Sequence, residues 1–144
     1  MNAKVFIRCM EKKTYKIFYM RFDVLYRTVY MRVLIQRVKR AAVVVDGRVE
    51  SQIEKGLLLR RGVGKEDRSE DAEWMSGKIR DMRIFEDASC KMNLSIKHSG
   101  GSALSVPQFT LYADTKKGNR PGFNLSADPD TAKALWKEFG ERLE

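Results

Sequence analysis

The sequence predicts an α+β fold, in which two helices pack on a mostly antiparallel, curved or barrel-like sheet. Three observations support this prediction: short β-branched runs separated by turn signals, a hairpin dipeptide in the first half, and two amphipathic helical segments. The chain has 144 residues, which is enough for one domain and too few for two well-formed cores.

The predicted strands begin at Met31. Residues 31–38 alternate between the two faces of a strand, as a half-buried strand does. Residues 41–53 are predicted to form two short strands around Asp46-Gly47, a dipeptide that tolerates the positive φ angles of a type I′ turn. A third, buried strand is predicted at residues 56–62, where glycines bound the sequence LLLRR. Further strands are predicted at residues 83–87, 91–96 and 105–111.

Two helices complete the predicted fold. The first is expected from about Ser69 to about Met82, because acidic residues crowd its N-terminal end and apolar residues recur at helical spacing. The second is expected to begin at Pro129, with Asp128 as its N-cap. Its apolar face consists of Ala132, Leu135, Trp136, Phe139 and Leu143.

The first 30 residues differ from the rest of the chain. They contain seven Lys/Arg residues against Glu11 and Asp23, so more than half of the net charge of +9 lies there. We therefore divide the chain into an N-terminal extension, 1–30, and a domain, 31–144. The extension is interpreted either as an RNA-binding arm or as an appendage outside the fold. A pI near 9.7 favours a polyanionic partner such as RNA.

The composition argues against several classes of site. Zinc sites commonly use clustered His and Cys, and nucleophilic triads usually need a His base. The chain has one histidine, His98, which is expected to be a loop residue because it stands beside Ser99-Gly100-Gly101. Cys9 and Cys90 lie far apart without metal or disulfide spacing, which fits a reducing cytosol. No run of about 18 apolar residues occurs, so a membrane span is not expected.

The most informative segment is residues 105–123, SVPQFTLYADTKKGNRPGF. Pro107 cannot donate a ladder hydrogen bond, so it belongs at an edge, a start or a bulge of a strand. In a strand, Gln108 and Thr110 would share one face, and Phe109 would point to the other. This pattern predicts either a small polar pocket with a hydrophobic wall or a strand with one side in solvent.

The same segment resembles the signature of the D-aminoacyl-tRNA deacylase (D-tyrosyl-tRNA deacylase) family. Three other stretches resemble family motifs in the correct order: MRVLIQRVKRAAVVVDGRV, GLLLRRGVGKEDRSEDAEWMSGKI and MRIFEDASCKMNLS. The resemblance covers about residues 31–143. It implies a cytoplasmic homodimer that needs no metal and no organic cofactor. It also implies that the chain hydrolyses the ester of D-aminoacyl-tRNA, and of mischarged glycyl-tRNA, as a chiral proofreading step in translation.

The resemblance also implies which residues form the site. The catalytic segment would comprise Gln108, Phe109 and Thr110, with backbone N–H groups near Phe109 and Thr110 stabilising the oxyanion. The residues expected to bind the 3′ end of the tRNA are Arg37, Pro107, Leu111, Lys116, Lys117 and Arg120.

Two features depart from the family pattern. Pro107 stands where the family usually has serine, and no Gly-Pro-x-Thr segment is present, although the family uses one to exclude L side chains. We therefore expect a truncated member that lacks its C-terminal strands. Two alternatives to an active hydrolase remain: a non-catalytic RNA-binding protein and an inactive fragment.

Overall fold

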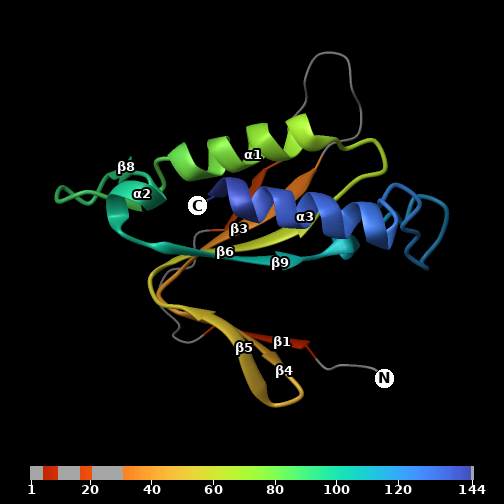
Figure 1. Ribbon diagram of the computed structural model, residues 1–144, viewed down its shortest axis with the longest axis horizontal. Helices are drawn as coiled ribbons and strands as arrows, with labels where there is room; N and C mark the ends of the chain where they lie inside the picture. The colour runs from red at the N-terminus through yellow and green to blue at the C-terminus, as the bar shows by residue number, and fades with distance from the viewer. Residues whose placement is uncertain (1–4, 10–16, 21–30, 144) are drawn as a thin grey trace. The chain divides into compact units, whose positions relative to one another are not determined.

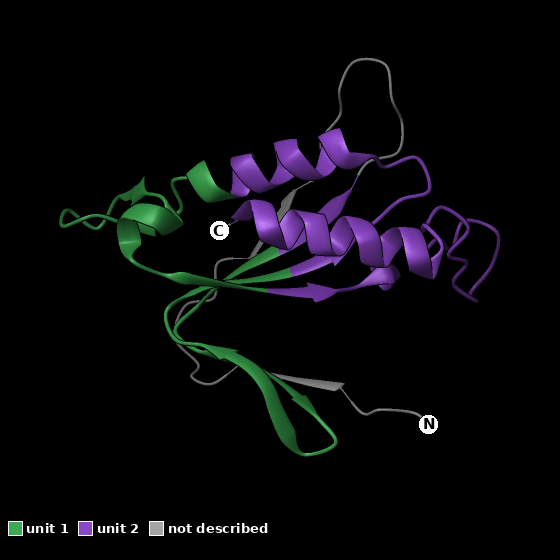
Figure 2. Cartoon of the chain, viewed as in Figure 1, with its two compact units in different colours: residues 1–18, 35–59, 80–104 green, residues 19–34, 60–79, 105–144 purple. Residues whose placement is uncertain are grey.

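The computed structural model describes residues 5–9, 17–20 and 31–143, with the backbone alone given for the first two segments. The chain divides into two compact units, each built from three stretches of sequence (Figure 2). Unit 1 comprises residues 1–18, 35–59 and 80–104, and unit 2 comprises residues 19–34, 60–79 and 105–144.

A three-stranded antiparallel sheet lies in unit 1. Its strand order is β1 (Val5–Cys9), β4 (Ala41–Val45) and β5 (Arg48–Ile53). The turn between β4 and β5 has φ angles of 48° at Asp46 and 83° at Gly47, which confirms the predicted hairpin. The register shifts between Val43 and Val44, where the pairing skips Glu50, so β5 contains a bulge.

The second sheet has the order β2 (Ile17–Met20), β3 (Arg32–Val38), β6 (Gly56–Gly62) and β9 (Ser102–Pro107). The strands predicted at 31–38 and 56–62 are thus confirmed. Strand β6 is buried on both faces at Leu57, Leu58 and Leu59, which explains its continuous apolar run.

Glycine is required where β6 begins. A Cβ atom added at Gly56 would lie 1.7 Å from the carbonyl oxygen of Ser102, the first residue of β9. The two segments that approach each other here both belong to unit 1. A hydrogen bond of 3.0 Å from the Ser102 N–H to the carbonyl of Lys55 joins them.

Unit 1 also contains a small hairpin and a short helix. Strands β7 (Phe85–Glu86) and β8 (Met92–Leu94) pair antiparallel around a turn, as predicted. The predicted strand at 91–96 is wrong in its last two residues, because Ser95 is the N-cap of helix α2 (Ile96–Ser99). The Ser95 hydroxyl accepts a hydrogen bond from the His98 N–H at 3.4 Å and pairs with His98 Nδ1 at 2.8 Å.

Unit 2 contains the ends of the long strands and both long helices, α1 (Ser69–Asp81, whose last two residues belong to unit 1) and α3 (Pro129–Leu143). Figure 1 shows both helices on the same side of the sheet. Both predicted helices are confirmed, and Asp128 caps α3 by accepting hydrogen bonds from the N–H groups of Asp130 and Thr131.

Ion pairs and hydrogen bonds join α1 to α3. The Ser69 hydroxyl donates to Glu138, and the Arg142 guanidinium lies 2.8 Å from Glu138 and 3.5 Å from Glu73. The side chains of Phe139, from α3, and Met75, from α1, are fully buried, so both helices contribute to the core of unit 2.

The predicted α+β class with antiparallel sheets is confirmed, but the sheets of the described residues form no closed barrel. Within the described part of the chain, no helix is both long and apolar enough to span a bilayer. Strands β1 and β2 fall inside residues 1–30. The division of the chain at residue 30 stays a prediction, since the remaining residues of that segment lie outside the description.

Candidate functional site: a cavity beside a strand-to-helix junction

The chain changes from strand to helix at Pro107. Strand β9 ends there, and residues Phe109–Tyr112 form a turn of 3-10 helix, η1. The Gln108 N–H makes the last bond to β6, donating to the Arg61 carbonyl at 2.6 Å. The predicted strand at 105–111 is therefore wrong beyond Pro107, and strand alternation does not govern the side chains that follow.

The start of η1 presents main-chain donors. The first i→i−3 bond of the turn runs from the Leu111 N–H to the Gln108 carbonyl at 3.2 Å, so the N–H groups of Phe109 and Thr110 precede it. The Gln108 side chain does not cap them. It donates instead to the Thr110 hydroxyl, which brings together the two polar side chains of the segment. Amides in this position are the ones that a short helix leaves for a ligand.

Arg32, on β3, holds the other end of η1. Its Nη1 donates to the Leu111 carbonyl at 2.7 Å, and its guanidinium lies 4.3 Å from the centre of the Tyr112 ring. Tyr112 is almost fully buried and packs against Gly62 of β6. The 3-10 turn is thus fixed from both ends, by β6 and by β3.

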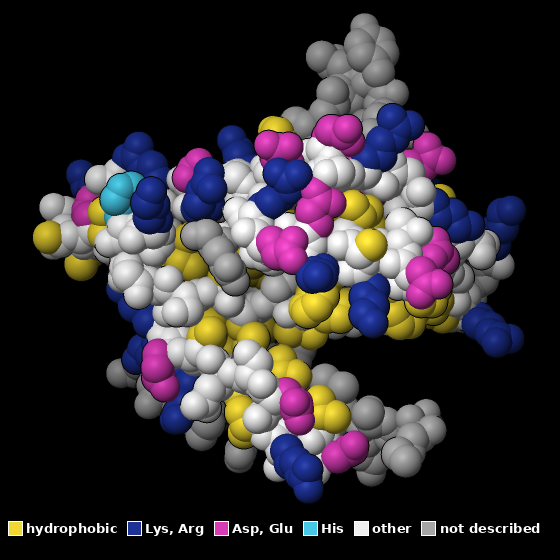
Figure 3. Space-filling view, in the orientation of Figure 1, with side chains coloured by type: hydrophobic (Ala, Val, Ile, Leu, Met, Phe, Trp, Pro, Cys, Tyr) yellow, Lys and Arg dark blue, Asp and Glu magenta, His cyan; other side chains and the backbone are white. Residues whose placement is uncertain are grey.

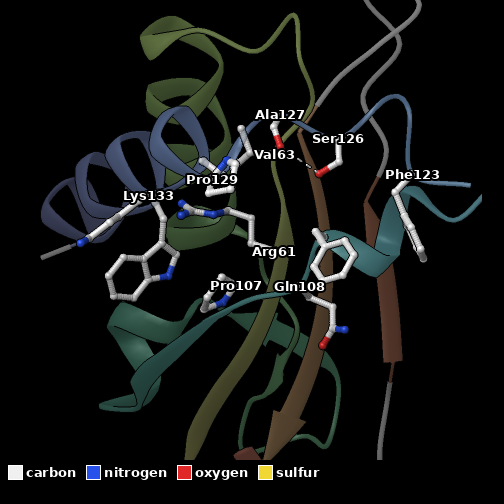
Figure 4. Close-up of a pocket in the computed structure, with 12 residues that line it drawn as sticks. Arg61, Val63, Pro107, Gln108, Phe123, Ser126, Ala127, Pro129 and Lys133 are labelled. Atoms are coloured by element: carbon white, nitrogen blue, oxygen red, sulfur yellow. Dashed lines mark hydrogen bonds between the residues drawn. The ribbon is translucent and has the colours of Figure 1, made fainter. Parts of the chain in front are cut away.

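A cavity of about 690 Å³ opens beside this junction, entirely within unit 2 (Figure 4). Gln108 and Phe109 contribute to its wall, and Phe109 is 58% exposed while meeting the Phe123 ring edge-on at a centroid distance of 5.0 Å. Such a volume is in the usual range for a small-molecule site. The cavity is lined by Arg61, Val63, Pro107, Gln108, Phe109, Phe123, Ser126, Ala127, Pro129, Ala132, Lys133 and Trp136.

The wall opposite β9 is held to the end of β6. The Ala127 N–H donates to the Val63 carbonyl at 2.9 Å, and the Lys65 N–H donates to the Leu125 carbonyl at 3.1 Å. These bonds position the segment that leads into α3. Ala132, Lys133 and Trp136 then add one side of α3 to the cavity.

Arg61 is the unusual member of the lining. Its side chain runs from β6 toward α3 (Figure 4), is 1% exposed, and lies 4.2 Å from the centre of the Phe139 ring. None of its three guanidinium nitrogens has a hydrogen-bond partner among the described residues. Burial lowers the pKa of Arg61 to about 9, although the nearby Asp67 carboxylate opposes this shift.

The basic loop closes on itself. The N–H and carbonyl groups of Asp114 and Gly122 exchange two hydrogen bonds of 2.9 Å, so residues 115–121 form a self-contained turn. Lys116, Lys117 and Arg120 are exposed on it, and Figure 3 shows dark blue basic side chains at that end of the molecule. Lys117 and Arg120 also line a smaller hollow of about 150 Å³.

Arg37 is in unit 1. Its Nη1 donates to the Ile84 carbonyl at 2.9 Å and its Nη2 to Glu86 at 3.0 Å. It is not among the residues that line the cavity. Its role in binding therefore stays a prediction based on the resemblance.

The structure brings only part of the predicted set to the cavity wall, namely Pro107, Gln108 and Phe109. Thr110 and Leu111 follow in η1, and the three basic residues lie on the loop beyond it. Sequence reasoning missed Arg32, Arg61 and Trp136. A signal for Arg61 was present, because an arginine occurs in register with Leu57 and Leu59 inside a run assigned as a buried strand.

The chemistry available in the cavity is limited. Among the described residues, the ionisable members of its lining are Arg61 and Lys133, and no carboxylate or imidazole of that part of the chain is positioned there as a base. Among the described residues no group of three or more His, Cys, Asp or Glu side chains could hold a metal ion. Main-chain amides are therefore the most direct means by which this wall can stabilise negative charge.

Residues 34–144 match a family model described as D-Tyr-tRNA(Tyr) deacylase, and the chain belongs to that family. It is also similar to a solved structure, the c-Myc DNA Unwinding Element Binding Protein. The two sequences are 37% identical, with a TM-score of 0.73, over 77% of this chain and 74% of the other.

Proposed function

We propose that this protein hydrolyses the ester bond of D-aminoacyl-tRNA, releasing the D-amino acid and the tRNA. The observation that supports this proposal is the pair of amides at the start of η1, beside a cavity large enough for an amino acid and a nucleoside. Family membership supports the same class of reaction.

In this proposal the ester carbonyl lies at the Gln108–Phe109 wall, with its oxygen toward the N–H groups of Phe109 and Thr110. When water attacks the carbonyl carbon, the oxygen gains negative charge, and the two amides donate to it. One such donor typically contributes about 3 kcal/mol to lowering the barrier. The Thr110 hydroxyl would not be the nucleophile, because the described residues that line the cavity include no carboxylate or imidazole to activate it.

The substrate supplies what the cavity lacks. The hydroxyl next to the esterified oxygen on the terminal ribose would orient the attacking water. The carbonyl carbon gains the water oxygen, its bond to the ribose oxygen breaks, and that oxygen takes up the proton released by water. The second proton of the water passes to solvent, so the products are a free carboxylate, the ribose hydroxyl of the tRNA and one released proton.

The expected partner is the 3′ end of an aminoacyl-tRNA. Lys116, Lys117 and Arg120 project from the closed loop of the same unit and would meet RNA phosphates. Discrimination is expected to be steric, so glycyl-tRNA would also be a substrate because glycine has no side chain to exclude. A homodimer in the cytoplasm belongs to the same proposal.

A deacylation assay with matched D- and L-aminoacyl-tRNA tests the function. We expect faster release of the D-amino acid, and release from glycyl-tRNA, without added metal. Equal rates for the D and L esters would contradict chiral proofreading. A Thr110→Ala variant that binds tRNA but loses all activity would contradict catalysis by the main chain.

A second candidate is nucleic-acid binding without catalysis. The net charge of +9 favours it, and the solved relative is named for binding a DNA element. In that case the chain would bind tRNA with strong salt dependence but release no amino acid from either ester.

A further inference from the structure

Two buried donors on the α3 side of the cavity have no hydrogen-bond partner among the residues that the structure describes. They are the guanidinium of Arg61, from β6, and the indole Nε1–H of Trp136, from α3. Native proteins rarely leave such groups unpaired, because each one has lost its water without gaining a bond. Both are donors, so their common partner would be an acceptor, and the positive charge of Arg61 favours an anion.

We propose that Arg61 and Trp136 form an anion subsite, which binds a carboxylate or phosphate group carried by the aminoacyl-adenosine end of the substrate. This rests on the proposed function, since the same cavity holds the ester at the Gln108–Phe109 wall. The subsite lies at the other side of the cavity, toward α3 (Figure 4).

The surroundings of Arg61 favour an anion over a neutral group. The guanidinium stacks at 4.2 Å on Phe139, an apolar partner that accepts no conventional hydrogen bond. Lys133, exposed on α3, adds a second positive charge to the cavity lining, in which the described part of the chain places no Asp or Glu. Asp67 is the acidic group that influences Arg61, and its carboxylate accepts hydrogen bonds from the Gly64 N–H at 2.6 Å and the Tyr112 hydroxyl at 3.5 Å.

Because the Arg61 guanidinium is buried, we expect an anion that bonds to it to increase the affinity of the ligand strongly. The guanidinium has already been removed from water, so an incoming anion bonds to it without that desolvation being repeated on binding. Because its nitrogens are closed to solvent, an anion reaches them only when side chains of the cavity lining move. The substrate offers two such groups: the 5′-phosphate of the terminal adenosine, and the side-chain carboxylate of an acidic amino acid.

Four stable amide analogues of 3′-aminoacyl-adenosine distinguish these sources. They carry D-asparagine or D-aspartate, each with or without a 5′-phosphate, and Asn and Asp differ in charge but hardly in shape. We expect at least one anionic group to improve binding to the native protein by about 10-fold or more, measured by calorimetry. The arm that shows the gain identifies the source.

Variants of the protein test whether the improved binding of the anionic analogues depends on the subsite. Arg61→Met should reduce it to less than about twofold, whereas Arg60→Met, which makes the same charge change at the neighbouring position outside the cavity lining, should retain it. If Arg61→Met gives no cooperative melt, Trp136→Phe decides instead, because it keeps the ring and removes the N–H.

Equal binding of all four analogues, no binding of any, or a gain that survives in the deciding variant would overturn the subsite. Failure of the subsite is separable from failure of the proposed function. Hydrolysis of D-aminoacyl-tRNA without an anion preference removes only the subsite, whereas an anion preference without hydrolysis supports the subsite and removes the deacylase.

Discussion

At the scale of single residues, catalysis would depend on a backbone atom rather than on a side chain. The N–H of Phe109 precedes the first bond of η1, and the side chain of the preceding residue leaves it uncapped. Its ring is more than half exposed and lies against Phe123, so ring and amide are separable by mutation.

The variants Phe109→Pro and Phe109→Ala distinguish the effect of the Phe109 amide from that of its ring. Both remove the ring, but only proline removes the amide hydrogen, and proline suits the first position of a helical turn. We expect kcat for the D ester to be about 100-fold lower in Phe109→Pro than in Phe109→Ala, because one oxyanion donor is lost. Single-turnover deacylation measures this difference. Equal rates in the two variants would remove the Phe109 amide from the mechanism.

Arg61 is expected to destabilise the protein that contains it. Its guanidinium is buried without hydrogen bonds to the described residues, and an apolar residue of similar length would fill the same space. Replacing buried charge by an apolar group stabilises some proteins by 1–4 kcal/mol, so we expect Arg61→Met to increase the free energy of unfolding by about 1–3 kcal/mol. Denaturant titration at pH 7 measures it.

The difference in the free energy of unfolding between Arg61→Met and the native protein should depend on pH, because the pKa of Arg61 is lowered in the folded state. Because the pKa of Arg61 is lowered to about 9 in the folded state, the unfolded state binds more protons above that pH. The native protein therefore gains stability relative to Arg61→Met as pH rises through 9, and the gap between the two proteins narrows. A gap that stays constant from pH 7 to pH 10 would contradict the lowered pKa.

The residues that sequence reasoning found were those with unusual chemistry for their place. Pro107 in front of an apolar run indicated an interruption, and the structure places the end of β9 there. Arg32 and Trp136 could not be found in this way, because their roles depend on contacts with Leu111 and with the cavity, far away in the sequence.

At the scale of secondary-structure elements, two glycines give opposite predictions. A Cβ at Gly56 would overlap the main chain of β9, which cannot yield as a side chain could. Gly140 lies in α3 with nothing within 4 Å of an added Cβ.

We expect Gly56→Ala to destabilise the protein by about 3 kcal/mol or to prevent folding, as overpacking does. Gly140→Ala should stabilise it by about 0.5–1 kcal/mol, the usual helix preference of alanine over glycine. Thermal melts of the two variants beside the native protein test both. A tolerated Gly56→Ala would mean that β6 and β9 do not approach so closely.

Elements with strong local signals were predicted from sequence within a few residues. The Asp46-Gly47 hairpin and the capped helix α3 are examples, because turn and cap residues act on their immediate neighbours. The 3-10 turn was missed, since the sequence FTLY has the composition of a strand. There two hydrogen bonds override the strand preference of the sequence: the Gln108 N–H donates to the Arg61 carbonyl, and Arg32 donates to the Leu111 carbonyl.

At the scale of the whole molecule, acid should unfold the protein through hydrogen-bonded carboxylates in both units. The pKa of Asp87 is lowered mainly by the Lys91 N–H, that of Asp128 by the Thr131 N–H, and that of Glu138 by the Ser69 hydroxyl. Each group therefore contributes stability above its unfolded pKa of about 4 and loses it as pH falls through the lower folded value.

We expect the midpoint of thermal unfolding to fall steadily below about pH 4.5. Replacing these three residues by Asn or Gln should lower the midpoint at pH 7 and flatten its decline in acid. Circular dichroism melts at a series of pH values measure both effects. A variant with an undiminished acid slope would show that other groups control acid unfolding.

The class of fold was predictable from sequence, because period, turns and helix caps agree along residues 31–143. Whether the sheets close into a barrel was not predictable, since closure depends on how strands distant in sequence pair, and in the described residues they do not close. The contribution of β1 to a sheet with β4 was likewise hidden, because its pairing partner lies more than 30 positions further along.

The bridge between Asp114 and Gly122 gives the basic loop a freedom that the rest of unit 2 lacks. Because its two ends are tied to each other, residues can be exchanged or inserted between them while η1 and α3 keep their places. If the loop binds RNA as proposed, its sequence could therefore change the preferred nucleic acid without displacing the cavity wall at η1, and an engineer could graft a new recognition sequence there.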